Sequence, residues 1–257
     1  MNNCALRGVA VALFLLGANA ALGAILENTT EQVYDLSPHA SISIRNTDGR
    51  INIYASDTPH LKVKAVRRAF TKERLEMIKV DVVVRGASAV IETTIPPAPK
   101  GSMLADRSGT VDYTIVVPQD CTLSRVELAN GEIVIEGVYG SGIDARLNNG
   151  RMQLTNCFSA ARVSVGQGGL DVFHSWWDAR AFTLSADVGN GDIRVDFPPD
   201  ASLRLDAATT NGHITNRFAT DKDGGHAQTL VTTIGGGSAT EFKLRTTNGN
   251  IRIGTAY

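Results

Sequence analysis

Apolar and polar residues alternate over most of the chain. In one clear stretch the apolar positions are Ile143, Ala145, Leu147, Met152 and Leu154, with charged and amide side chains between them. A period of two places successive side chains on opposite faces of a β-strand. The pattern predicts an all-β protein whose strands turn an apolar face inward and a polar face outward.

An Asn-Gly or Asp-Gly turn recurs between stretches of this kind. Its glycines are Gly49, Gly131, Gly150, Gly191, Gly212 and Gly249, with a degenerate copy at Gly168. From the second copy onward the spacing is roughly 20 residues, apart from one longer interval near the end. Tips of separate hairpins would come about 8–12 residues apart. The longer period predicts windings that stack in parallel around a common core.

The residue types at this turn suit a corner between strands. Glycine supplies a positive φ, and asparagine tolerates a left-handed backbone. If windings stack at the ~4.8 Å strand spacing, the amides of such a column can hydrogen bond to each other. The predicted structural ladder consists of Asn130, Gly131, Asn149, Gly150, Asn190, Gly191, Asn211, Gly212, Asn248 and Gly249. A polar binding ridge is the alternative interpretation of this column.

The region between the first two turns is less regular. Its alternation predicts strands over 61–70, 78–86, 87–95 and 111–118. Residues 71–78 are predicted as one short helix, with Thr71 as its N-cap and Arg74 on its exposed face. Residues 96–109 contain Pro and Gly and are predicted to form a protruding loop.

Residues 1–24 have the pattern of a signal peptide. Arg7 precedes an apolar run that ends in small residues. A retained membrane anchor is the alternative, but the run is at the short end for crossing a bilayer and contains Gly17 and Asn19. Cleavage is therefore favoured, which leaves residues 25–257 as one exported domain with no further membrane span.

Charge and cysteine content restrict the partners of this domain. The formal net charge is −1 at pH 7, so the chain has no basic field for nucleic acid. An exported chain can form a disulfide between Cys121 and Cys157. The alternative is two small buried apolar side chains, and the non-equivalent positions of the two cysteines in the repeat favour it.

Metal and cofactor sites find little support in the sequence. The five histidines are His39, His60, His174, His213 and His226. They are not spaced as metal ligands, so surface positions are expected for them. Asp221 and Asp223 resemble the start of a calcium loop but lack its other acidic ligands. We therefore expect no metal ion and no cofactor.

Acidic residues on the windings raise the possibility of a carbohydrate-active enzyme. Glycoside hydrolysis uses two carboxylates about 5–10 Å apart in a groove. The outward candidates are Glu132, Glu136, Asp171, Asp187, Asp192 and Asp196. Arginines are interleaved with these acids, which is typical of a solvated face. No catalytic residue is assigned.

The stretch "HSWWD" at 174–178 is the most conspicuous local feature. Adjacent residues of a strand face opposite ways, so one of Trp176 and Trp177 is expected to point outward. An exposed indole could bind a sugar or a partner protein. The alternative is that at least one of the two rings caps the interior of a winding.

The combination of "VDYTIVVP", the ladder of "NGxI" turns and the ending "IGGGSATEFKLRTTNGNIRIG" resembles the bacterial putative adhesin family, domain of unknown function 4097. The resemblance covers roughly residues 35–254. It implies a right-handed, single-stranded β-helix-like solenoid at the cell envelope or outside the cell. It supplies no catalytic residues.

These observations favour an exported, non-enzymatic scaffold in the periplasm, at the cell surface or in the medium. Repeated polar faces along one axis would allow weak contacts to add. Its expected partners are an envelope polysaccharide or a surface protein, and the oligomeric state stays open. The alternatives are a module that binds cell-wall glycan or an envelope-stress ligand and, third, a carbohydrate-active enzyme.

Overall fold

The computed structural model describes residues 25–37, 39–97, 106–218, 227–236 and 239–256. The predicted signal peptide, His226, Asp221 and Asp223 lie outside the described residues, as does the middle of the predicted loop 96–109.

The described chain is mostly β, with one short helix, as the alternation predicts. The N-terminal elements are β1 (Leu26–Asp35), β2 (Ser41–Ser56), β3 (His60–Ala69), α1 (Lys72–Met77), β4 (Lys79–Arg85), β5 (Ser88–Thr94) and β6 (Thr110–Pro118). The remaining strands are β7 (Thr122–Glu136), β8 (Ile143–Thr155), β9 (Ala161–Phe173), β10 (Thr183–Asn190), β11 (Ile193–Phe197), β12 (Leu203–Asn211), β13 (Ile214–Asn216), β14 (Thr229–Ile234), β15 (Glu241–Asn248) and β16 (Ile251–Thr255). All belong to one mixed 16-stranded sheet.

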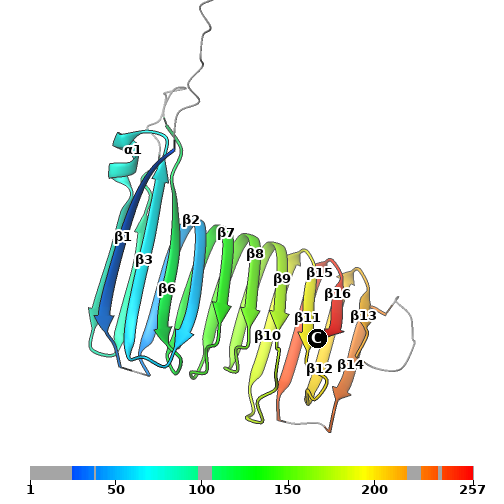
Figure 1. The fold of residues 1–257 in the computed structure, drawn as a ribbon. Coiled ribbons are helices and arrows are strands. Elements are labelled where there is room, and N and C mark those ends of the chain that lie inside the picture. The colour runs from blue at the N-terminus through cyan, green and yellow to red at the C-terminus, as the bar shows by residue number, and fades with distance from the viewer. Residues whose placement is uncertain (1–24, 38, 98–105, 219–226, 237–238, 257) are drawn as a thin grey trace, which may run out of the picture.

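The Asn-Gly turns are bends within windings, as predicted. β7, β8 and β9 each run through their own bend and pair with one another in parallel and in register. Gly131 lies opposite Gly150, which lies opposite Gly168. Figure 1 shows the windings side by side along one axis. No two arms that share a bend in this series pair with each other in the described sheet.

The bend glycines have the positive φ expected of them, with one exception. Gly131 has a φ of 135° and Gly150 one of 134°, whereas Gly212 does not adopt the left-handed region. Gly212 is still required, because a Cβ there would lie 1.9 Å from the carbonyl oxygen of Gly249. Close stacking, and not only backbone handedness, therefore fixes the residue type at these bends.

The last winding in the sequence is not the last in space. β15 pairs in parallel with β10 on one side and with β12 on the other. β16 likewise lies between β11 and β13. The chain thus forms the β12/β13 winding first and then returns to insert β15/β16 beside the earlier windings.

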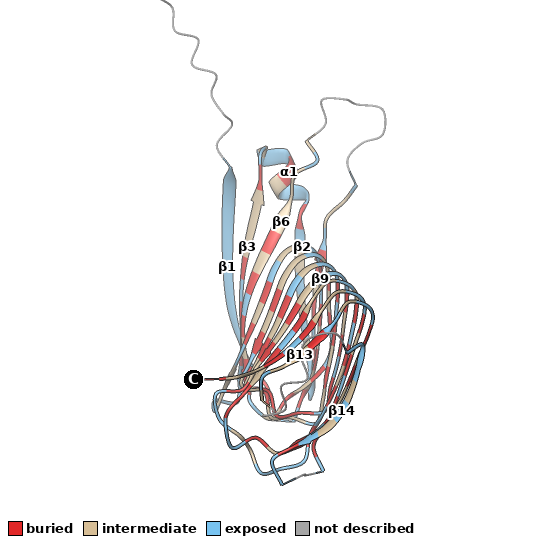
Figure 2. Cartoon of the chain, turned by 90° about the vertical axis from the view of Figure 1, so that its right-hand side faces the viewer, coloured by how far each residue is buried: buried red, intermediate tan, exposed pale blue. Residues whose placement is uncertain are grey.

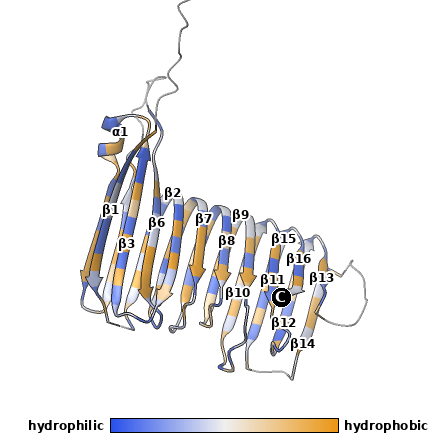
Figure 3. Cartoon of the chain, in the orientation of Figure 1, coloured by the Kyte–Doolittle hydropathy of each residue, from blue (hydrophilic) through white to orange (hydrophobic). Residues whose placement is uncertain are grey.

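The core is a column of inward side chains that runs through all the windings. Ile133, Ile135, Met152 and Leu154 are fully or almost fully buried, and they alternate with polar outward residues. Figure 2 shows buried positions alternating with exposed ones along the arms, and Figure 3 shows the same alternation as hydropathy. Burial of this apolar surface is the main stabilising contribution.

The N-terminal part closes one end of the stack. β2 pairs with β7 along its length. On its other side β2 pairs with β5 before the bend and with β6 after it. β6 pairs antiparallel with β3, and β3 with β1, so that β1 is the edge of the sheet at this end.

The short helix has the predicted cap but not the predicted exposed face. The Thr71 hydroxyl accepts a hydrogen bond from the Arg74 N–H at 3.2 Å. The Arg74 side chain is only 6% exposed, so the expectation that it faces solvent is wrong. Its guanidinium donates to the carbonyls of Ser108 and Pro96 at 2.7 and 2.6 Å, which lie outside the strands and need partners.

Cys121 and Cys157 are unpaired and buried, in agreement with the favoured alternative. Burial raises the pKa of the Cys121 thiol to about 12 and that of Cys157 to about 11. Both side chains therefore act as small apolar core residues.

Candidate functional site

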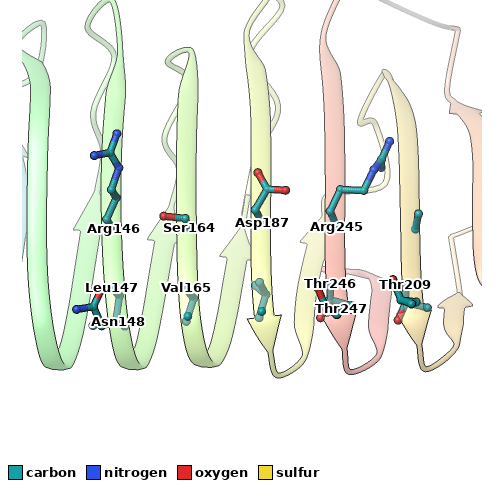
Figure 4. A pocket seen from close by; sticks show the side chains of 15 residues that line it. Arg146, Leu147, Asn148, Ser164, Val165, Asp187, Thr209, Arg245, Thr246 and Thr247 are labelled. Carbon is teal, nitrogen blue, oxygen red and sulfur yellow. The ribbon is translucent and has the colours of Figure 1, made fainter.

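A groove of about 530 Å³ crosses the outer face of the windings just before the bends. It runs over β8, β9, β10, β15 and β12, and its lining side chains are shown in Figure 4. The alternation of apolar and polar residues gives no indication of this groove. Its one signal in the sequence is a pair of glycines, Gly166 and Gly189, that stand immediately before the turn.

The two glycines form the floor of the groove. At the equivalent position the neighbouring windings carry Asn148, Thr247 and Thr210. A Cβ on Gly166 would lie 2.7 Å from the Asn148 carbonyl oxygen, and one on Gly189 2.6 Å from the Gly166 carbonyl oxygen. Close approach of the windings thus excludes side chains here and leaves the outer surface hollow.

Charged side chains line one wall of the groove. Arg146, Ser164, Asp187 and Arg245 lie in one row across neighbouring strands (Figure 4). Arg146 pairs with Asp144 at 3.0 Å, and Arg245 pairs with Asp206 at 2.6 Å. Asp187 forms no ion pair with any residue that the structure describes. Its exposed carboxylate is therefore the group in this wall that is available to a ligand.

The amides of the bend column hydrogen bond to each other in two runs. In the first, Asn149 donates to Asn130 at 3.0 Å, and Asn130 donates to Asp48 at 2.8 Å. In the second, Asn211 donates to Asn248 and Asn248 to Asn190, each at 2.7 Å. The winding that carries Gln167 separates the two runs. Because these amides bond to one another, the column serves as a structural ladder more readily than as a binding ridge.

The two tryptophans point to different sides of the loop between β9 and β10. Trp176 is 43% exposed, and its ring centroid lies 4.5 Å from that of Phe158. Trp177 packs against the core, with Phe182 at 5.3 Å and Phe197 at 5.9 Å between centroids. One ring points outward, as expected, and the other caps the interior, although both residues lie in a loop and not in a strand.

Trp176 is part of an exposed surface that we call the aromatic corner, formed by Tyr139, Trp176 and Arg180. The Tyr139 and Trp176 rings are 6.1 Å apart, with planes 25° from parallel. The Arg180 guanidinium lies 5.0 Å from the Tyr139 centroid and pairs with Asp178 at 3.0 Å. The corner therefore offers two aromatic rings with a cation beside them.

His174 is buried, so the expectation of a surface position is wrong for this residue. It is 2% exposed and contacts five aromatic rings, those of Phe158, Trp177, Phe182, Phe197 and Phe242. Its Nε2 lies 3.2 Å from the Cys157 carbonyl oxygen, and its buried Nδ1 has no partner among the described atoms. Burial lowers the pKa of His174 to about 4, so the ring is neutral at pH 7.

The structure shows no metal cluster of His, Cys, Asp or Glu within its described ranges. His39, His60 and His213 are exposed, as expected.

Among the six candidate acids, Asp187 alone lines the groove. Most of the others are paired with arginines on the outer face: Glu132 with Arg50, Asp171 with Arg151, Asp192 with Arg252 and Asp196 with Arg194.

Comparison with known proteins places the chain in a family. The family model described as "Toastrack DUF4097" matches residues 100–254, and the chain belongs to this family, as its turn ladder and ending indicate. Curated proteins give no match. No helix among the described residues has the length and apolar character needed to cross a bilayer.

Two solved structures are reported as similar to this chain. A "putative cell adhesion protein" from Clostridium sporogenes has 14% identity and a TM-score of 0.51, over 89% of this chain and 100% of that one. A "putative adhesin" from Bacteroides fragilis has 13% identity and a TM-score of 0.31, over 89% and 97% of the two chains. At 14% identity the match to the first structure shows a shared fold and nothing more. The match to the second structure, with a TM-score of 0.31, supports no conclusion.

Proposed function

We propose that residues 25–257 form an exported, non-enzymatic binding scaffold of the adhesin type. In this proposal the windings make a right-handed, single-stranded β-solenoid in which one winding is inserted out of order. The observation that supports this proposal is the arrangement of sites on the outer surface. The stacked windings hold the groove and the loops that form the aromatic corner, and neither site contains a metal cluster or a paired set of carboxylates among its described residues.

The test of this proposal measures location and binding together. Cells that produce the full chain are fractionated, and the N-terminus of the accumulated protein is sequenced. We expect a start near residue 25 and recovery in the periplasm, on the surface or in the medium. Binding of the purified chain to isolated envelopes should be saturable. A cytoplasmic, uncleaved chain that does not bind envelopes would overturn the proposal.

The groove supports binding more than hydrolysis. A glycosidase places two carboxylates about 5–10 Å apart around the scissile bond. One carboxylate, Asp187, lines this groove, and the row beside it continues with Ser164 and Arg245. A carboxylate, a hydroxyl and exposed backbone can accept and donate hydrogen bonds to sugar hydroxyls. The protein would instead be an enzyme if the wild-type chain released reducing sugars from envelope polysaccharide and the Asp187→Asn variant did not.

A second candidate function is glycan binding at the aromatic corner. Pyranose rings stack on exposed aromatic faces, and the corner presents Trp176 beside Tyr139. We expect Trp176→Ala to weaken binding to isolated cell-wall glycan at least about tenfold, the effect of losing 1.4 kcal/mol. The matched control is Tyr54→Ala, which removes an exposed aromatic side chain from the outer face of β2.

The measurement is a glycan pull-down or titration calorimetry with both variants. Because Trp176 is half exposed, its removal should leave the melting temperature close to that of the wild type. Equal binding by Trp176→Ala and the wild type would exclude the corner. An equal loss in Tyr54→Ala would point to a diffuse apolar effect and not to a site.

A further inference from the structure

Strand β1 contributes one half-buried side chain, Tyr34, to the packing against the core. Its 10 residues pair with β3 in an antiparallel ladder that extends from Leu26↔Ala69 to Asp35↔His60. Every β1 residue is exposed except half-buried Tyr34. The first buried position after the strand is Leu36, whose N–H donates to the Pro59 carbonyl at 3.0 Å. β1 can therefore detach as far as Leu36 without opening the apolar core.

Opposite charges hold β1 on β3. Glu27 pairs with Arg68 at 2.8 Å, Glu31 with Lys62 at 2.8 Å, and Asp35 with His60 at 3.0 Å. Each of these pairs is substantially exposed, so each contributes little to stability and is screened by salt. A side-chain hydrogen bond from the Arg67 guanidinium to Asn28 Oδ1 at 2.5 Å and the backbone hydrogen bonds of the ladder supply the remaining attachment.

The same charges determine what can occupy the edge of β3. Glu27, Glu31 and Asp35 all lie on one face of β1. An antiparallel pair of two β1 strands centred on Glu31 would place these carboxylates against each other, which is unfavourable. The corresponding face of β3 carries Lys62, Lys64 and Arg68. The charges on β3 therefore favour pairing of its edge with an acidic strand. Pairing of the exposed edge of β1 with a second β1 strand is unfavourable, because like charges would face each other.

We propose that the edge of β3 is an interaction surface for the β1 strand of a second copy of this chain, so that two copies can exchange their first strands. The incoming strand has the same sequence, so it recreates the ladder, the Glu27–Arg68 and Glu31–Lys62 ion pairs and the Asp35–His60 contact of the closed chain. Exchange then requires only detachment of β1 and encounter of two copies, and no buried side chain has to be exposed.

Single cysteines on paired positions test this surface. Thr29 lies opposite Val66 on the charged face, and neither side chain is buried. One preparation carries Thr29→Cys and another Val66→Cys, and the two full-length chains are mixed under mild oxidation. We expect a disulfide-linked heterodimer on a non-reducing gel, several-fold above either variant alone. High salt, which screens the ion pairs, should speed its formation.

Charge exchange and a distant cysteine provide the controls. Glu31→Lys in the Thr29→Cys chain should reduce the heterodimer several-fold, and Lys62→Glu in the Val66→Cys chain should restore it. In the control mixture, Val231→Cys replaces Val66→Cys. Val231 is 64% exposed but lies at the opposite end of the sheet, so it is not opposite Thr29 in any β1–β3 ladder. Heterodimer at background level, equal product with Val231→Cys, or homodimer of Thr29→Cys alone would each overturn the proposal.

Discussion

At the scale of single residues, His174 is the clearest conflict between chemistry and location. A titratable ring occupies a site lined by aromatic side chains, and its Nδ1 has no described partner. The neutral ring fits this environment, whereas the protonated ring would place a charge among apolar groups. The residue therefore makes the stability of the protein depend on pH.

The direction of this dependence follows from the depressed pKa. The folded chain keeps His174 neutral down to about pH 4, whereas the unfolded chain binds a proton near the ordinary pKa of 6.5. Between these values the unfolded state holds more protons, so stability falls as pH falls from 6.5 toward 4. The loss due to this one group is on the order of 3 kcal/mol. Urea denaturation at pH 7.5 and pH 4.5 measures it.

His174→Phe supplies the comparison, because phenylalanine suits the aromatic surroundings and does not titrate. We expect this variant to lose much less stability than the wild type between pH 7.5 and pH 4.5. An unchanged difference between the two pH values would show that other groups cause the acid sensitivity.

At the scale of elements, each winding depends on how closely its bend approaches the next one. Gly131 has a φ of 135°, and a Cβ there would lie 1.8 Å from the Gly49 carbonyl oxygen. Gly86, in the turn between β4 and β5, also has a positive φ of 55° but has open space around it. The two positions therefore separate backbone strain from steric conflict between windings.

We expect Gly131→Ala to destabilise the protein by more than about 3 kcal/mol, because strain and steric conflict add. Gly86→Ala should cost only about 1 kcal/mol, since it carries the strain alone. Chemical denaturation of both variants provides the measurement. Similar losses at the two glycines would contradict the importance of close stacking at the bends.

At the scale of the whole molecule, the order of the windings in space matters more than their order in the chain. The C-terminal winding buries Phe242, Leu244, Ile251 and Ile253 between two other windings. The N-terminal strand β1 buries no side chain fully and contributes only half-buried Tyr34. The two ends of the chain therefore contribute to stability in very different ways.

A chain that stops after residue 236 should lose the folded C-terminal third, because β10/β11 and β12/β13 would no longer share a neighbour. A chain that lacks residues 25–35 should melt within a few degrees of the full chain, as expected for a change of about 1–2 kcal/mol. Thermal denaturation and limited proteolysis distinguish the two. A more damaging deletion at the N-terminal end would contradict this assignment.

Much of the fold follows from local patterns in the sequence. Alternation around residues such as Ile133 and Met152 places the strands, and the bends come where Asn-Gly interrupts it. Thr71 is found as a helix cap because capping depends on adjacent residues. Arg74 and His174 are misplaced because their burial depends on partners distant in sequence, such as the carbonyls of Ser108 and Pro96 around Arg74.

The candidate sites divide in the same way. An exposed ring in the pair Trp176 and Trp177 is foreseeable, although the pair lies in a bent loop and not in a strand. The groove is not, since it requires that Gly166 and Gly189 lie side by side on neighbouring windings. Likewise, Asp187 remains available only because Arg245, its neighbour in the sheet, pairs with Asp206.

The sequence alone determined which residues face the core, where each winding bends and which amides can form a ladder, since these depend on a period of two and on residue types within a few positions. Only the tertiary structure decided the order in which windings meet. Asn248 lies between Asn190 and Asn211 because the last winding inserts between two earlier ones. The physical reason is that nearly identical windings present nearly identical edges, so the repeat pattern specifies stacking but not which copies become neighbours.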